Sequence, residues 1–297
     1  MRPLRAIGIY LLGVFLGGAL LAPWLYRLAE LVHDSVPRIA VAPFHRFVTR
    51  SLLIVALAGL WPVLRALGAR SLRDLGLTRP RGQGRELLAG LLIGFISFAV
   101  VGGLALAGGG REFEASLRAG VVAQRLLNAA ASAVVVALME EVLFRGGVFG
   151  GLRRVFDWRL ALGISSLVYA VVHFLGRPAG NGGVTWSSGL ELLPGMLQGF
   201  GEVRELLPGL LNLTLAGALL ALAFQRTGHL CVSIGIHAGW IFWMKSYGTF
   251  TNAVPSANPW LWGTQRMFDG WIASTVLLGA LIAWPRLPIG RSSPSAT

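Results

Sequence analysis

Five ionisable residues lie in strongly apolar segments and are of types that carry chemistry. Glu140 and Glu141 follow a long apolar stretch, and Arg145 comes four residues after Glu141. His173 and His237 lie in two further apolar segments. A charge at the centre of a bilayer costs about 2.5–3.5 kcal/mol on insertion scales, so such residues indicate a functional site. Their least costly arrangement is convergence from three helices on one polar cavity.

The chemistry that these residue types permit is the activation of water. A carboxylate held against an imidazole can remove a proton from a bound water, and a second imidazole can stabilise the resulting oxyanion. At helical spacing, Glu141 and Arg145 can form a local salt bridge. Glu140 points about 100° away from Glu141 on a helix and is free to face the cavity. The spacing therefore predicts that Glu141 is a structural acid and Glu140 a chemical one.

Each of these residues also has a simpler explanation. A buried Glu/Arg pair alone is more often a structural lock or a transporter gate than a catalyst, and a lone histidine in a helix more often only packs. Two Glu and two His on three helices disfavour a purely structural interpretation. A proton-coupled transporter that uses the Glu/His cluster remains an alternative, although the internal repeat typical of many transporters is not visible in the sequence.

A metal site is a second way to use the same side chains. Zinc is commonly held by His and Glu, so Glu140, His173 and His237 would be its ligands if it binds. The sequence contains no His-Glu-x-x-His motif and no two histidines four residues apart. We therefore expect water activation without a metal or other cofactor. No Gly-x-Ser-x-Gly motif is present, which argues against a serine hydrolase.

The composition is that of an integral membrane protein. Of the 297 residues, 55% are hydrophobic and 13% are charged, and the mean hydropathy is +0.67, whereas soluble domains carry about 25% charged residues. The net charge of +13 does not indicate nucleic-acid binding, because the basic residues lie between apolar runs, where they contact lipid headgroups. The expected partner is therefore the lipid bilayer. The single cysteine, Cys231, excludes an internal disulfide framework.

Eight apolar windows are long enough to cross a bilayer, which takes about 20 residues. They lie near residues 6–28, 44–67, 86–108, 121–151, 158–176, 205–226, 229–247 and 266–284. Because open sheets cannot survive in lipid, all eight should be helices. We predict an all-α, polytopic transmembrane bundle of about eight helices around a polar intramembrane cavity. It is expected to be one domain, 1–297, with a flexible tail, 286–297.

Two windows and the loop charges add detail. The fourth window is longer than a span needs, so it is expected to tilt or to break near the glycines after Arg145. The first lacks a small-x-small cleavage site and is expected to be a retained helix.

Arginines cluster between the second and third windows, from Arg65 to Arg85. The positive-inside rule then places both termini in the cytoplasm of a multi-pass inner-membrane protein.

The polar residues resemble the motifs of a known family. Glu140-Glu141-x-x-x-Arg145 resembles the first motif of the CAAX prenyl protease 2 and bacteriocin-processing (CPBP, Rce1-like) intramembrane proteases. Tyr169-x-x-x-His173 resembles the second motif, which usually starts with Phe. Tyr in place of Phe retains the ring and adds a hydroxyl.

The third motif lies near the end of the resemblance. The stretch 215–240 resembles the turn between the sixth and seventh helices of the family, and it contains the motif histidine, His237. The resemblance covers roughly residues 71–245, on consecutive apolar windows. The motifs are short, but their order makes the combination specific.

The resemblance implies an intramembrane endopeptidase of the glutamate type, from a family formerly described as metalloproteases. In that scheme Glu140 and His173 would activate the nucleophilic water, and His237 would contribute to the oxyanion site. Glu141 and Arg145 would support the architecture. The expected substrate is a peptide or a membrane protein, cleaved for precursor processing or sorting. Prenylated substrates are not implied by the sequence itself.

One position departs from the family pattern. The family commonly has Asn four residues after the last motif histidine, whereas this chain has Ile241, which cannot donate a hydrogen bond. The oxyanion site would then use His237 alone, or a donor such as Asn212 or Ser233. Loss of one oxyanion donor can cost about 10²–10³ in rate. A catalytically silent immunity or binding protein of the same fold is therefore the main alternative.

Overall fold

The chain folds into helices that form two compact units. The computed structural model describes residues 2–32, 42–78, 83–114, 117–176, 183–201, 203–264 and 266–289. The smaller unit comprises Met1–Arg70 and Val172–Val203, and the larger comprises Ser71–Val171 and Arg204–Thr297. The two units are described separately below. Whether they behave as the single predicted domain stays a prediction.

The smaller unit is built on two long helices. α1 spans Arg2–Leu31 and α3 spans Phe44–Ala66, and the two pack along each other. The short helix α8, Ser188–Gly195, packs against α1 and leads into the 3₁₀ segment η3, Met196–Phe200. The rest of this unit in the described residues is the end of α7 and connecting turns.

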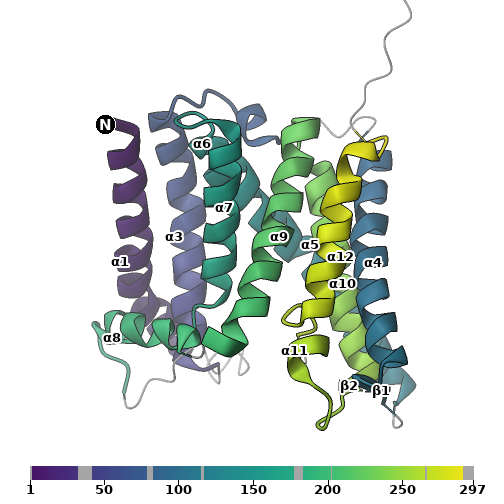
Figure 1. Cartoon of the computed structure of the whole chain (residues 1–297). Coiled ribbons are helices and arrows are strands. Elements are labelled where there is room, and N and C mark those ends of the chain that lie inside the picture. Colours follow the sequence, from purple (N-terminus) through teal and green to yellow (C-terminus); the bar gives the residue numbers. More distant parts are fainter. Residues whose placement is uncertain are drawn as a thin grey trace, which may run out of the picture. The chain divides into compact units, whose positions relative to one another are not determined.

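The larger unit holds the remaining elements (Figure 1). They are η1 (Leu72–Leu75), α4 (Gly84–Ala107), β1 (Arg111–Phe113), α5 (Ala119–Glu141), η2 (Val142–Phe149), α6 (Gly150–Leu152), α7 (Trp158–His173), α9 (Val203–Thr227), α10 (Cys231–Phe250), β2 (Thr251–Ala253), α11 (Pro259–Trp262), α12 (Trp271–Ala283) and η4 (Trp284–Arg286). α10 lies at the centre and packs against both α4 and α5. Apolar side chains of α9 and α12 close the core around α10.

All eight predicted windows fall on helices. Among the described residues, five stretches are long and apolar enough to span a membrane: Arg5–Leu31, Phe44–Ala66, Gly84–Ala107, Ala119–Leu152 and Leu206–Thr227. Trp158–His173 and Trp271–Arg286 are shorter apolar helices. The eighth, α10, carries His237 and Lys245 and is mostly buried by its neighbours, so it does not need a lipid-compatible surface all round. These helices make the chain a membrane protein, as predicted.

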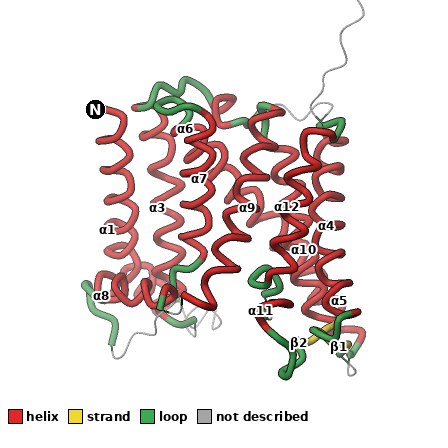
Figure 2. The backbone as a smooth tube through the Cα atoms, viewed as in Figure 1, coloured by secondary structure: helices red, strands yellow, loops and turns green. Residues whose placement is uncertain are grey.

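A small β-sheet, like the short helices α8 and α11, lies outside the predicted windows. β1 and β2 form a small antiparallel pair in which Glu112 lies opposite Asn252 (Figure 2). The pair is fastened by buried Arg111, whose Nε donates to Thr251 Oγ1 at 3.0 Å and whose Nη2 donates to the Thr251 carbonyl at 2.9 Å. Burial lowers the pKa of Arg111. The flexible tail was predicted over 286–297. Of these residues, 286–289 are described: Arg226 Nη2 donates to the Leu287 carbonyl at 2.8 Å, and Ile289 is buried in the apolar core. The rest of the tail, and Arg79 and Arg81 of the arginine cluster, lie outside the described residues.

Four glycines set the contact between α4 and α10. Gly90 and Gly94 on α4 face Gly235 and Gly239 on α10, each pair four residues apart. A Cβ at Gly239 would lie 2.5 Å from the backbone oxygen of Leu91, and a Cβ at the other three would meet facing backbone even more closely. Small residues at this spacing let helix backbones approach in a membrane. The contact fixes how far α10 lies from α4, and therefore where its side chains point.

This close contact predicts a contrast between two glycines of the same helix. Gly94→Ala should lower the stability of the protein by about 1–3 kcal/mol, because the added methyl group overpacks the contact with α10. Gly103→Ala is the matched control, since nothing lies within 4 Å of its Cβ position and Ala is the better helix former. Thermal unfolding in detergent measures both. Equal melting temperatures for the two variants would contradict the packing argument.

Candidate active site

Glu140 and Glu141 end α5 at the point where the helical hydrogen-bonding pattern changes. α5 continues without a break into η2, a π-helix over Val142–Phe149. π-helical turns are rare and are frequent at functional sites. The sequence predicted a tilt or a break near the glycines after Arg145, but the helix instead continues as a π-helix. Gly146 of this segment packs against the backbone of Leu75, where a Cβ would lie only 2.7 Å from the carbonyl oxygen.

The predicted pair of Glu141 and Arg145 is present and deeply buried. Glu141 is 0% exposed and Arg145 is 1% exposed. Arg145 Nη1 donates to Glu141 Oε1 at 3.0 Å. The guanidinium also lies 4.4 Å from the ring centroid of Tyr169, in cation–π geometry. Contacts from two helices, α5/η2 and α7, therefore hold this ion pair in place.

His237 is the residue that joins the two acids. Its Nδ1 lies 2.8 Å from Glu141 Oε1, and its Nε2 lies 3.7 Å from Glu140 Oε2. A carboxylate accepts hydrogen bonds, so Nδ1 carries the proton in this contact. Glu141 therefore accepts from both Arg145 and His237 through one oxygen. Its other oxygen, Oε2, has no hydrogen-bond partner among the described residues.

Glu140 occupies a different environment from Glu141. Its side chain is 23% exposed, whereas that of Glu141 is completely buried. Its distance of 3.7 Å from His237 Nε2 is in ion-pair range but too long for a hydrogen bond. The divergence expected from helix spacing is therefore present: Glu141 faces inward to Arg145, and Glu140 lies at the more open side of the imidazole.

Tyr169 belongs to the site, although the sequence motif alone indicated only that it replaces the usual Phe. Its hydroxyl oxygen lies 3.5 Å from His237 Nε2. The ring is buried and makes edge contacts with Phe144, at 5.1 Å between centroids, and with His237, at 6.2 Å. The hydroxyl that distinguishes Tyr from Phe therefore points at His237. In the sequence, the one sign of this role was a Tyr at the first position of a motif that usually starts with Phe.

His173 is placed by the structure in the smaller unit. It is the last residue of α7, one helical turn after Tyr169, and is partly buried. The α7 spacing puts both residues on one helix face. Glu140 and His237 belong to the larger unit, so the predicted partnership of His173 with Glu140 stays a prediction.

The two substitute donors that the sequence suggested are used elsewhere. Asn212 Nδ2 donates to the carbonyls of Phe268 and Gly270, both at 2.8 Å, and so anchors the chain before α12. Ser233 Oγ donates to the Leu230 carbonyl at 3.0 Å within its own helix turn. Ile241 packs in an apolar cluster with alanines of α5. Tyr169 is therefore a better candidate for the missing donor than either Asn212 or Ser233.

The sequence analysis expects no metal, and names Glu140, His173 and His237 as the ligands only if zinc binds. Among the residues that the structure describes, no group of three or more His, Cys, Asp or Glu side chains is placed to hold a metal ion. Whether the protein works without a cofactor stays a prediction.

Comparison with known families gives one match. Residues 122–243 match the family model for type II CAAX prenyl endopeptidase Rce1-like proteins, a stretch that covers less than half of the chain. The match contains all three motifs and confirms the family resemblance drawn from them. No curated protein and no solved structure matches the chain.

Proposed function

We propose that this protein is an intramembrane endopeptidase of the CAAX-protease type, which hydrolyses a peptide bond with an activated water. The family is a protease family. The observation that carries the proposal is the environment of His237. A buried imidazole whose one nitrogen is held by a buried Glu/Arg pair, and whose other nitrogen faces Glu140 and Tyr169, is an arrangement for proton chemistry rather than for packing.

In this proposal Glu140 is the general base. It is the more accessible acid of the pair, so it is the one that a water and a substrate can reach. His173 acts with it on the nucleophilic water, as the family resemblance implies. Proton removal from water by a positioned side chain contributes typically about 10²–10⁴ in rate.

His237 and Tyr169 form the proposed oxyanion site. In this role His237, when it is protonated, donates from Nε2 to the developing negative charge, while Glu141 holds the ring through Nδ1. The Tyr169 hydroxyl, 3.5 Å from Nε2, supplies the second donor where Ile241 cannot. Arg145 pairs with Glu141 and lies over the Tyr169 ring. Preorganised donors of this kind usually give the largest single contribution to acyl-transfer catalysis.

The substrate and its location follow from the same features. We propose a peptide or membrane-protein substrate that is cleaved within the bilayer or near its cytoplasmic side, in a multi-pass protein of the inner membrane with both termini in the cytoplasm. The distribution of arginines supports this orientation. A precursor that needs processing or sorting is the expected substrate class.

Comparative proteomics of peptide termini tests the proposed activity. Cells that produce the wild-type protein should contain new peptide termini that are absent from cells producing Glu140→Gln or His173→Ala variants at equal, folded levels. The cleaved substrate is identified in the same experiment. Identical sets of termini in all three cell lines would contradict the proposal.

One observation favours a second function. Ile241 is fully packed among apolar side chains, so the position where the family usually has a donor has become part of the core. A catalytically silent immunity or binding protein would keep the fold and lose the chemistry in this way. Complementation separates the two: full function of Glu140→Gln in cells supports binding, and loss of function supports catalysis.

The role of the Tyr169 hydroxyl is tested by removing that one atom. Tyr169→Phe should lower the cleavage rate about 10²-fold at saturating substrate, with little change in KM, because an oxyanion donor acts in the transition state. Tyr247→Phe is the matched control, since it also removes a buried hydroxyl, which donates to the Gly102 carbonyl. The assay uses a peptide identified by the proteomics. Equal rates for the two variants would exclude the hydroxyl from the reaction.

A further inference from the structure

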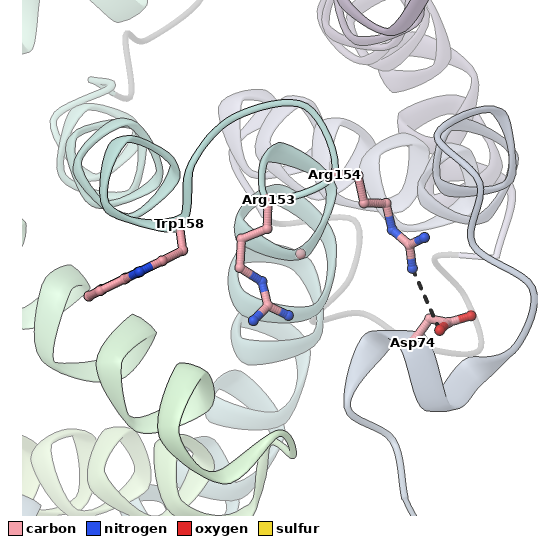
Figure 3. A pocket seen from close by; sticks show the side chains of 5 residues that line it. Asp74, Arg153, Arg154 and Trp158 are labelled. Carbon is pink, nitrogen blue, oxygen red and sulfur yellow. Dashed lines mark ion pairs between the residues drawn. The ribbon is translucent and has the colours of Figure 1, made fainter.

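A polar pocket lies within the larger unit, and none of its lining residues belongs to the candidate active site. Figure 3 shows its lining, which comes from η1, α6, the turn that follows α6 and the start of α7. The lining residues are Asp74, Gly150, Arg153, Arg154 and Trp158, and the volume is about 310 Å³. Two arginines, one carboxylate and an indole surround a space large enough for a phosphate with its neighbouring atoms.

Arg153 is partly buried and has donors to spare. Its guanidinium carbon lies 4.9 Å and 5.1 Å from the ring centroids of Phe149 and Phe224, which hold the group in place. Nη1 donates to Gln225 Oε1 at 2.5 Å. Nε has no hydrogen-bond partner among the described residues. A buried donor without an acceptor is costly, so this side chain has hydrogen-bonding capacity that its described neighbours leave unused.

Arg154 adds a second positive charge beside the first. It is exposed and makes a loose ion pair with Asp74, with 3.6 Å between Nη2 and Oδ1. Asp74 Oδ2 accepts from the backbone N–H of Ser71 at 2.9 Å, so this carboxylate also has a structural task. Two guanidiniums against one carboxylate leave the pocket with a net charge of +1. Burial and the nearby Arg154 both lower the pKa of Arg153.

The pocket lies where two apolar helices end. Arg153 directly follows the candidate span Ala119–Leu152, and Trp158 is the first residue of the apolar helix Trp158–His173. Arg and Trp at the ends of membrane helices lie at the level of the lipid headgroups. Basic pockets between such helices bind anionic headgroups. The position of the pocket therefore points to a ligand that a membrane presents.

We propose that this pocket binds a phosphate oxyanion, as carried by an anionic phospholipid headgroup. Arg153 and Arg154 donate to the phosphate oxygens, and Trp158 packs against the adjoining glycerol. Planar guanidinium groups suit this acceptor because they can donate two parallel hydrogen bonds. The site is separate from the proposed proteolysis, and its test does not depend on any enzymatic activity.

Native mass spectrometry of the delipidated full chain tests the binding. Phosphatidylglycerol and phosphatidylcholine of equal chain length are titrated separately, and inorganic phosphate is added as a competitor. Phosphatidylglycerol should bind at least tenfold more tightly, because phosphatidylcholine carries a compensating cation. Competition by inorganic phosphate would mean that the oxyanion itself is recognised. Binding of phosphatidylglycerol without such competition would mean that the pocket needs the whole lipid. Failure of both phosphatidylglycerol and phosphate to bind would overturn the proposal.

Two charge-neutralising variants locate the site. Arg154→Gln should weaken phosphatidylglycerol binding about fivefold, which corresponds to about 1 kcal/mol for one arginine near a membrane surface. Arg286→Gln removes the same charge from an exposed side chain that donates to the Ile282 carbonyl and is not part of the pocket lining, and should leave the affinity unchanged. Equal losses in the two variants would mean that net charge alone attracts the lipid, and the proposed site would be wrong.

Discussion

Replacing Glu140 with Gln is expected to lower the cleavage rate by about 10²–10⁴-fold, which is the usual contribution of a general base. Gln keeps the size of the side chain and cannot accept the proton. Because the Glu140 side chain is partly exposed and lies 3.7 Å from His237 Nε2, the fold should be retained. The rate is measured on the purified protein with its identified substrate, alongside the unfolding temperature.

A second glutamate–histidine contact provides the control for this variant. Glu86 Oε2 lies 2.7 Å from His229 Nε2, in a part of the larger unit that holds none of the proposed catalytic residues. Glu86→Gln should leave the rate unchanged. If Glu140→Gln retained full activity with a normal unfolding temperature, Glu140 would not be the base and the proposed mechanism would be wrong.

Replacing Arg145 with Met is expected to destabilise the protein by about 3–5 kcal/mol, the usual cost of leaving one member of a buried ion pair unpaired. The variant leaves the Glu141 carboxylate, which is 0% exposed, without its arginine partner, while the contact to His237 Nδ1 remains. Adding Glu141→Gln to this variant removes the buried charge and should recover much of the loss. Denaturant unfolding in detergent measures the three free energies.

The exposed pair of Arg27 and Glu30 is the matched comparison. Its atoms are also 3.0 Å apart, but the two side chains are 59% and 39% exposed. Glu30→Gln should cost at most about 1 kcal/mol, because surface ion pairs contribute little. Similar losses for Glu30→Gln and Arg145→Met would mean that the buried pair is not required for stability.

The helices could be predicted from the sequence because membrane helices are specified locally. A run of about 20 apolar residues can satisfy its backbone in lipid only by coiling, and all eight windows became helices. The pairing of Glu141 with Arg145 was predictable for the same reason, since it needs only the geometry of one helix. The π-helix after Glu141 was not, because it depends on how the glycines after Arg145 pack against η1.

The contacts of His237 could not be predicted from spacing. Which acid its Nδ1 meets depends on how α10 crosses α5, and this is set by packing between helices that are distant in the sequence. The role of the Tyr169 hydroxyl could not be predicted either, because it depends on where Nε2 of His237 lies. Ile241 was recognised as an anomaly from the motif, but only its apolar neighbours show that the position now belongs to the core.

The glycine contact between α4 and α10 limits which substitutions this sequence can accept during evolution. Gly90, Gly94, Gly235 and Gly239 touch no candidate catalytic group in their close contacts, yet any side chain there would turn or shift the helix that carries His237. A complete mutational scan should therefore find these positions almost as intolerant as the active site. The outward-facing residues of α4, which are Leu88, Leu92 and Ile96, should accept nearly any apolar replacement. Substitution tolerance along α4 should thus alternate with the helical period. The intolerant face would be the one that packs against α10 and so positions His237.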